Sequence, residues 1–274
     1  EIDYKIPDPG KKIVIDTRLV SGENAVAMVG TSVYSMSKER PGTNGNVKVA
    51  LYRDGIFQDS MLPRFNQNIA QWVYESNNHI IEPQKSYTIR AKYSSLPEAI
   101  ASDRIPPPVY TNLFNTEVTS ATINGNVYSI PTSFSFKILD NPATEDYYRI
   151  SLSQRNGTPP VLFSSTNPVL TDFFNNFDFE GNGERRYFYF AYLSDKDLVN
   201  AASTFNILVE EEVINDLYLC LDHISKDYYE HERTKALAYF GGDGFSEPVQ
   251  IHSNVTNGYG IVAGTTPTTT KIEP

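Results

Sequence analysis

The chain has 274 residues, 20% of them charged, and a formal net charge of −10. Hydrophobic residues make up 40% of the sequence, an ordinary share for a globular protein that argues against wholesale disorder. Nucleic-acid binding is disfavoured because contacts to phosphates need clustered Lys and Arg. The basic pair Arg185-Arg186 stands next to Glu184 and is interpreted as a solvated strand start.

The composition predicts an all-β protein. The chain contains 18 Tyr and 15 Phe, which fit pleated and half-buried surfaces. It also contains 17 Pro and 16 Gly, as expected where many short strands need many turns. No apolar stretch approaches the roughly 20 residues that span a bilayer as a helix. The single cysteine, Cys220, lies in an apolar run and is expected to be a buried, unreactive side chain.

The first part of the chain, residues 1–105, predicts an immunoglobulin- or fibronectin-like β-sandwich. Ile13 and Ile15 share one face of a strand in residues 12–19. Residues 47–57 alternate and then turn at Asp54-Gly55, which indicates a β-hairpin. Residues 86–93 alternate apolar and aromatic side chains with polar ones. We expect a boundary at the three prolines 106–108, which cannot lie within a central strand.

Residues 106–274 predict a larger antiparallel β-sandwich or barrel-like domain. The strand at 185–193 is apolar or aromatic on both faces, which is typical of a strand buried on both sides. One helix is expected at 226–240, with Ser225 as its N-cap and Gly241-Gly242 at its end. A stripe along this helix is expected to pack against the sheet, and it consists of Tyr229, Arg233, Ala236 and Phe240.

The closing segment 247–266 predicts a late strand with Val249 and Ile251 on its buried face. Asn257-Gly258 then supplies a turn or bulge with positive φ. Gly260 and Gly264 are expected to let the last strand pass close to a neighbouring backbone, such as that of the helix. On this reading, Gly260→Val damages folding rather than binding.

The sequence carries no Gly-x-Ser-x-Gly, Walker or His-Glu-x-x-His motif, and we expect neither an enzyme nor a cofactor. The best metal candidate is a calcium loop at Asn176, Asp178 and Glu180. Its twelfth position is Tyr187 instead of the required Glu, so a polar, glycine-rich turn is the preferred interpretation. The histidines are weaker metal candidates, because His223 and His231 are two helical turns apart if both lie on a helix, and His252 could approach them only through tertiary folding. Surface or capping histidines are the preferred interpretation.

Aromatic side chains form a further candidate site. Exposed rings at Trp72, Tyr187 and Tyr189 would suit the stacking of sugars. Burial within the two sheets explains the same residues without a ligand, and that interpretation is preferred.

The C-terminal third resembles a Bacteroidetes lipoprotein family described as domain of unknown function 4249. Residues 221–234 match its "S-x-x-Y-Y-x-Y" helix start at Ser225, Tyr228 and Tyr229. Residues 247–266 match its "P-V-x-[VI]-x-S-N-I-x-N-G-x-G-I-F-x-G" strand, with Val255, Tyr259 and Val262 as departures. Looser matches follow in family order upstream, at residues 46–57, 83–93 and 141–152.

The resemblance implies an exported envelope lipoprotein. A signal peptide and a lipid-carrying cysteine would precede residue 1 and tether the chain to the outer membrane. The family is often associated with TonB-dependent receptors, which implies an accessory role in nutrient uptake by association. It implies no catalytic residues.

Three functions follow from these observations. The leading expectation is a non-enzymatic binding or accessory module, with an outer-membrane receptor or a surface polymer as partner. The second is a surface adhesin or structural protein, which an exposed aromatic patch or an unpaired edge strand would favour. The third is a glycan or peptide hydrolase, because catalytic groups are recognised by geometry rather than by local sequence.

Overall fold

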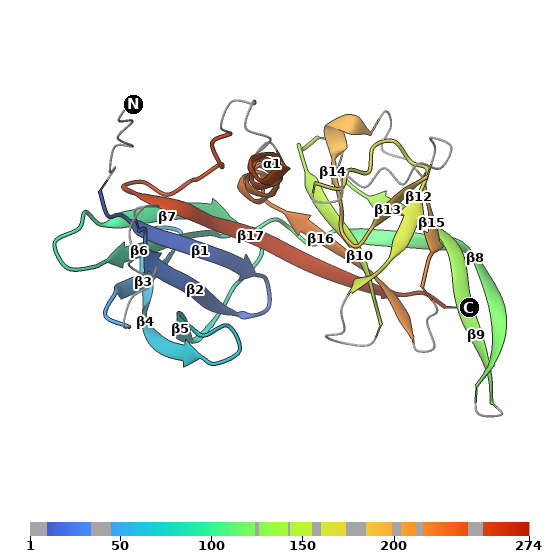
Figure 1. The fold of residues 1–274 in the computed structure, drawn as a ribbon, viewed down its shortest axis with the longest axis horizontal. Coiled ribbons are helices and arrows are strands. Elements are labelled where there is room, and N and C mark those ends of the chain that lie inside the picture. Colours follow the sequence, from blue (N-terminus) through green and yellow to red (C-terminus); the bar gives the residue numbers. More distant parts are fainter. Residues whose placement is uncertain are drawn as a thin grey trace, which may run out of the picture. The chain divides into compact units, whose positions relative to one another are not determined.

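The computed structural model describes residues 10–33, 45–123, 126–141, 143–154, 160–173, 185–198, 204–211, 216–240 and 249–273. The described residues form antiparallel strands and one α-helix near the C-terminus (Figure 1), which confirms the predicted all-β class. The chain divides into two compact units, Glu1–Ile105 with Ile251–Gly264 and Pro106–Gln250 with Thr265–Pro274. The sequence-based division placed the closing segment entirely with the second part, whereas 251–264 groups with the first.

The first unit is an antiparallel sandwich whose strands follow the immunoglobulin order. Its strands are β1 (Ile13–Val20), β2 (Asn24–Thr31), β3 (Lys48–Arg53), β4 (Ile56–Asn66), β5 (Gln71–Ile80), β6 (Ser86–Lys92) and β7 (Ala99–Arg104). They pair as β1-β2-β5-β4 and β3-β6-β7, which matches the A-B-E-D and C-F-G sheets of that fold. The long strand β4 pairs with both β5 and β3.

Period-two alternation builds this unit, as predicted. Ile13 and Ile15 are completely buried, and so is Ile89 on β6. The β3–β4 hairpin turns at Asp54 and Gly55, whose φ values of 49° and 80° are those of a type I′ turn.

The second unit contains two sheets and the helix. Its elements are β8 (Tyr110–Ile123), β9 (Asn126–Leu139), β10 (Tyr147–Gln154), β11 (Pro160–Val161), β12 (Phe163–Ser165), β13 (Arg186–Phe188), β14 (Ala191–Ser194), the 3₁₀ helix η1 (Asp195–Asp197), β15 (Thr204–Val209), β16 (Leu217–Ile224) and α1 (Lys226–Phe240). One sheet runs β11-β10-β16-β17, with β14 also on β10, and the other runs β13-β12-β15-β9-β8. Strand β17 (Gly258–Lys271) begins in the first unit and pairs with β16 in the second.

The predicted single strand at 185–193 is wrong. The segment forms two short strands in different sheets: β13 pairs with β12, and β14 pairs with β10. Tyr189 and Phe190 lie in the bend between them and are 41% and 36% exposed. The run is apolar throughout because its two halves contribute Phe188 and Leu193 to one core from two sheets.

The helix begins where the sequence predicts it. The Ser225 hydroxyl accepts a hydrogen bond from the Tyr228 amide at 3.2 Å, as an N-cap does. The predicted buried stripe is confirmed at Ala236 and wrong at Arg233, which is exposed. Tyr228 and Glu232 are the buried residues of the preceding turns. No helix among the described residues is long and apolar enough to cross a membrane.

Two further side-chain placements differ from the prediction. Cys220 faces away from the core side of β16 and is half-buried, with its sulfur 3.2 Å from the Ser153 hydroxyl. Val249 and Ile251 are 37% and 42% exposed, and their segment is not a strand. Pairing with the first unit resumes only at Thr256, which bridges to Ile100.

The glycines of β17 allow a close backbone approach, as predicted. Gly260 has a φ of 100°, and a Cβ there would lie 2.0 Å from the carbonyl oxygen of Ile15. A Cβ at Gly264 would lie 2.7 Å from the carbonyl oxygen of Arg104. The neighbouring backbone thus belongs to β1 and to the end of β7, and not to the helix that the sequence suggested.

We expect Gly260→Ala to lower the free energy of unfolding by more than about 3 kcal/mol, because the methyl group displaces β17 from β1. Gly22→Ala is the matched control, since Gly22 has a φ of 87° with nothing within 4 Å of a Cβ. It should lose about 1 kcal/mol through backbone strain alone. Urea unfolding of both variants measures the difference, and equal losses would show that the close approach does not matter.

Candidate functional site

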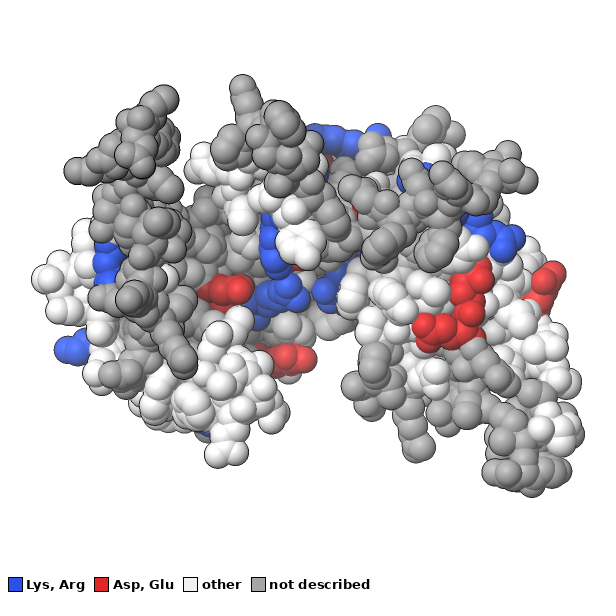
Figure 2. Space-filling model, viewed as in Figure 1, with Lys and Arg blue, Asp and Glu red and all other residues white. Residues whose placement is uncertain are grey.

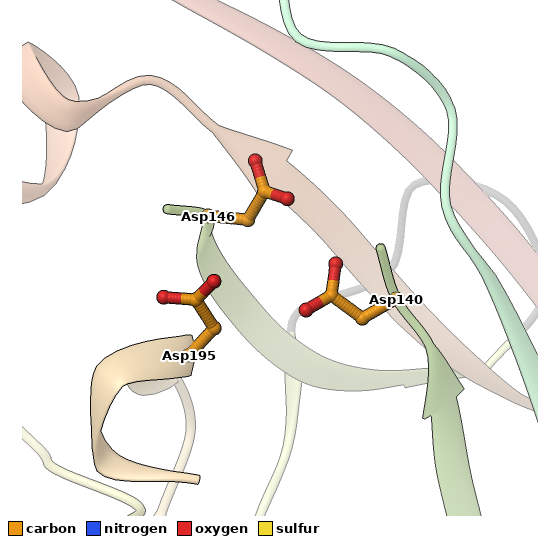
Figure 3. A group of neighbouring side chains, drawn as sticks. All are labelled: Asp140, Asp146 and Asp195. Carbon is orange, nitrogen blue, oxygen red and sulfur yellow. The ribbon is translucent and has the colours of Figure 1, made fainter. Parts of the chain in front are cut away.

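Three carboxylates converge at one end of the second unit. Asp140 follows β9, Asp146 precedes β10 and Asp195 begins η1 after β14. The pairing of β14 with β10 sets this arrangement, because the Asp195 amide donates a hydrogen bond to the Asp146 carbonyl at 3.0 Å. One carboxylate oxygen of each residue lies within 4.8 Å of the others (Figure 3).

The chain supplies its own partners for two of these carboxylates. His223, 3% exposed, places Nε2 3.0 Å from Asp146 Oδ1 and Nδ1 2.8 Å from the Pro107 carbonyl oxygen. Both ring nitrogens therefore lie within hydrogen-bond distance of an oxygen, which fixes the orientation of the buried imidazole. The Tyr148 hydroxyl donates to Asp140 Oδ1 at 2.5 Å.

Two carboxyl groups of the cluster have pKa values shifted in opposite directions. Burial raises the pKa of Asp146, but hydrogen bonds from His223 and Thr144 outweigh burial and hold this pKa below its usual value. Burial also raises the pKa of Asp195, and the charges of Asp140 and Asp146 add to that increase. The Oδ1 atom of Asp195 is enclosed and has no hydrogen-bond partner among the described residues.

The cluster is best explained as a polar junction. Calcium takes six to eight oxygen ligands, and here Asp140 and Asp146 already accept bonds from Tyr148, Thr144 and His223. These bonds tie together the ends of β9, β10 and β16. The stability of the second unit, rather than catalysis, is what this geometry supports.

A second polar surface lies on the first unit and is called here the basic face. It consists of the outward side chains of β3, β6 and β7 with two from β4: Lys48, Ala50, Tyr52, Phe57, Ser60, Ser86, Thr88, Arg90, Lys92, Ile100, Ser102 and Arg104. Alternation requires this placement, because the intervening residues, such as Leu51, Ile89 and Ala101, fill the core. Glu98 follows the same alternation at one corner of the basic face.

The cations of the basic face are exposed and have no acidic partner in the described part of the chain. Lys48, Arg90, Lys92 and Arg104 form no ion pair with the residues that the structure describes. Elsewhere in the unit, cations do have partners, as in the Lys85–Asp54 pair at 3.2 Å. Lys48 stands directly opposite Lys92 in the β3–β6 ladder, and like charges at opposed positions destabilise a sheet.

Aromatic rings lie in the middle of the basic face. The Arg90 guanidinium lies over the Tyr52 ring at 4.8 Å from its centre, a favourable cation–π contact. The Tyr52 ring meets the Phe57 ring edge-on at 5.6 Å and 76°. Phe57 is 52% exposed. Arg90, Tyr52 and Phe57 thus form a fixed row across three strands, with one ring open to solvent.

The sequence-based site residues lie elsewhere. Trp72 is half-buried in the first unit and contacts Phe65 edge-on at 5.5 Å. Tyr187 is half-buried on β13 in the second unit, and Tyr189 is exposed in the bend that follows. The calcium candidates Asn176, Asp178 and Glu180 lie outside the described residues.

Sequence reasoning missed both polar surfaces. The alternation at 86–93 does place Arg90 and Lys92 outward. That Lys48 stands opposite Lys92 follows only from the β3–β6 register, which the sequence does not give. The carboxylate cluster has no local signal, because its members are brought together by the pairing of β14 with β10.

Replacing Asp195 tests the electrostatics of the cluster. Its raised pKa means that the ionised form weakens the folded state above the usual aspartate pKa, and that this penalty disappears at lower pH. Asp195→Asn should therefore raise the Tm at pH 7, with the gain vanishing towards roughly pH 3.

Asp146→Asn is the matched control with the opposite sign. The pKa of Asp146 is lowered, so its ionised form stabilises the folded state above the usual pKa. The variant should have a lower Tm at pH 7. Thermal unfolding from pH 3 to 7 measures both, and a decrease in Tm at pH 7 for Asp195→Asn would contradict the assignment.

Comparisons with known proteins give a family and no function. No curated protein matches the sequence. The family model described as domain of unknown function, DUF4249, matches residues 1–271, nearly the whole chain. The chain therefore belongs to the DUF4249 family.

Proposed function

We propose that this protein is a non-enzymatic binding or accessory module of the cell envelope. In this proposal it is an outer-membrane lipoprotein, carried by a lipid on a cysteine before residue 1, and it serves a TonB-dependent uptake system. Its partner is an outer-membrane receptor or a surface polymer. The lipoprotein setting comes from the family resemblance, and the binding role is argued from the basic face.

The observation that carries the binding role is the set of cations on the basic face that have no ion-pair partner among the residues that the structure describes. Lys48 and Lys92 oppose each other without a described counterion, in a chain whose net charge is −10. Figure 2 shows charged side chains of both signs in small groups, some of them side by side. A local cationic surface on an acidic protein favours an anionic partner and disfavours non-specific attraction to polyanions.

The carboxylate cluster gives little support to the hydrolase alternative. A general acid or base must reach a substrate proton. The Asp146 carboxylate already accepts hydrogen bonds from His223 and Thr144, and its backbone carbonyl accepts one from the Asp195 amide. The cluster's histidine is 3% exposed. A role in holding strand ends accounts for these groups without a substrate.

Recovery of the native lipoprotein from its own outer membrane tests the proposal. The wild-type chain should co-purify with a receptor, a transporter or a surface polymer. A Lys48→Gln/Arg90→Gln variant should recover about tenfold less partner, equivalent to about 1.4 kcal/mol of binding free energy.

The matched control is Lys226→Gln/Lys235→Gln, which removes the same charge from exposed positions of the helix. It should recover the partner as the wild type does. Absence of any receptor, transporter or surface polymer from the wild-type preparation would overturn the proposed function.

The second candidate function, a surface adhesin, is favoured by the β8–β9 hairpin. Strand β8 ends its sheet, and no described strand pairs with its outer edge. Beyond Ser133, where the pairing of β15 with β9 ends, the hairpin strands pair only with each other among the described residues, and Figure 1 shows the hairpin extending past the remaining strands of its sheet. Exposed edges of this kind accept an added strand.

The adhesin alternative predicts a different sensitive residue. Val118 is 44% exposed on β8, and Val118→Lys places a charge that discourages strand addition. If the protein is an adhesin, this variant reduces attachment of cells carrying it, while Lys48→Gln/Arg90→Gln leaves attachment unchanged. The reverse pattern would exclude the hairpin as the adhesive element.

A further inference from the structure

We propose that the basic face binds an acidic polysaccharide, with its cations on the carboxylates and Phe57 stacked on a sugar ring. This inference rests on the proposed binding function and names the class of ligand. It is argued from the first unit alone, whose described residues carry all the groups involved.

The charges indicate a ligand that is repeatedly anionic. Arg104 stands opposite Ser86 at one end of β6, and Lys48 stands opposite Lys92 at the other. Six residues of strand separate these ends, which corresponds to roughly 20 Å. One small anion cannot contact cations that far apart, whereas a polymer with a carboxylate on each unit can contact several at once.

The opposed lysines show that the fold alone does not explain these charges. A sheet loses stability where like charges stand directly opposite, and Lys48 and Lys92 do so without a described carboxylate in contact. Glu98 at the corner is the nearest acid by alternation, and it forms no ion pair within the described residues. A bound carboxylate would remove the repulsion between the lysines.

The rings and hydroxyls between the cations favour a sugar. The Phe57 ring is 52% exposed, and Tyr52 holds it edge-on while Arg90 covers Tyr52. The C–H groups of a pyranose pack well on such an apolar ring. The Thr88 and Ser102 hydroxyls, 2.8 Å apart, lie on the same face and can bond to sugar hydroxyls.

The same face fits an anionic bilayer poorly. Ile56 beside the hairpin turn is 68% exposed and is the apolar group best placed to enter a lipid surface. The side chains of Asp54 and Glu82, 44% and 49% exposed, flank this end of the sheet as partners of Lys85 and Arg53. Approach of Ile56 to the bilayer would bring two carboxylates to anionic headgroups.

Titration with polygalacturonate tests the ligand class, using the full chain at low and physiological salt. Three comparison probes separate the contributions: methyl-esterified polygalacturonate keeps the sugar without the charge, polyglutamate keeps the charge without the sugar, and phosphatidylglycerol vesicles present anionic lipid. We expect polygalacturonate to bind at least about tenfold more tightly than each comparison probe.

Lys48→Glu is the decisive variant because it opposes Glu to Lys92. An opposite-charge pair stabilises the ladder, so the Tm should rise by up to about 4 °C. Affinity for polygalacturonate should nevertheless fall about tenfold or more. Loss of binding in a more stable protein cannot be attributed to unfolding. Lys226→Glu, with the same charge change on the helix, should leave affinity unchanged.

Phe57→Ala separates sugar stacking from charge. It should weaken binding of polygalacturonate about fivefold and leave any residual binding of polyglutamate unchanged. Equal binding of polygalacturonate and polyglutamate, preferential binding of the vesicles, or unchanged affinity in Lys48→Glu would each overturn the inference. The proposed function is tested separately by the pull-down. If Lys48→Gln/Arg90→Gln loses the native partner there while polygalacturonate fails the tests above, the binding function stands and only the assignment of a glycan ligand is wrong.

Discussion

The approach of β17 to the backbone of β1 is the constraint that sets the course of the last strand. Gly260 can lie there only because it lacks a Cβ, which would stand 2.0 Å from the Ile15 carbonyl oxygen. The Asn254 side chain then bonds both the amide and the carbonyl of Val262, at 3.0 and 2.8 Å. The strand continues into the second unit, where Thr266 and Thr268 donate to the carbonyls of Pro106 and Val109. One strand therefore contributes Val262 to the core of the first unit and pairs with β16 in the second. Its glycines serve the packing of the backbone and not the binding of a ligand.

The same alternation that fills the first core also produces the basic face. On β6 the core takes Ile89 and Ala91, so Arg90 and Lys92 must face solvent. Core burial fixes the register of β3 against β6, because a shift of one residue would expose Leu51. That register then places Lys48 opposite Lys92 regardless of their repulsion. The core's burial energy thus holds together a set of charges that would not assemble on electrostatic grounds.

Local pattern predicted the elements well and their long-range assembly poorly. The β3–β4 hairpin and the Ser225 cap follow from residues close in sequence, and the structure confirms both. The segment 185–193 was misjudged because apolarity on both faces also describes a chain that crosses between two sheets around Tyr189. Val249 and Ile251 alternate as a strand does, yet no described strand pairs with them and they are exposed. The carboxylate cluster was invisible because Asp146 and Asp195 are joined only by strand pairing.

Net charge is a poor guide to the local surface. A value of −10 describes the whole chain, but with a screening length of about 8 Å at physiological salt a ligand senses only nearby charges. Arg90 has Ala50 and Ile100 as its partners on the flanking strands, with Lys92 two residues along the same strand, and Glu98 is the one acid among the described residues that the alternation brings to this face. The distant acids still matter, since they repel a polyanion that approaches anywhere else. An acidic protein with a cationic face therefore restricts an anionic polymer to that face, whereas a uniformly basic protein would bind it at many places on its surface.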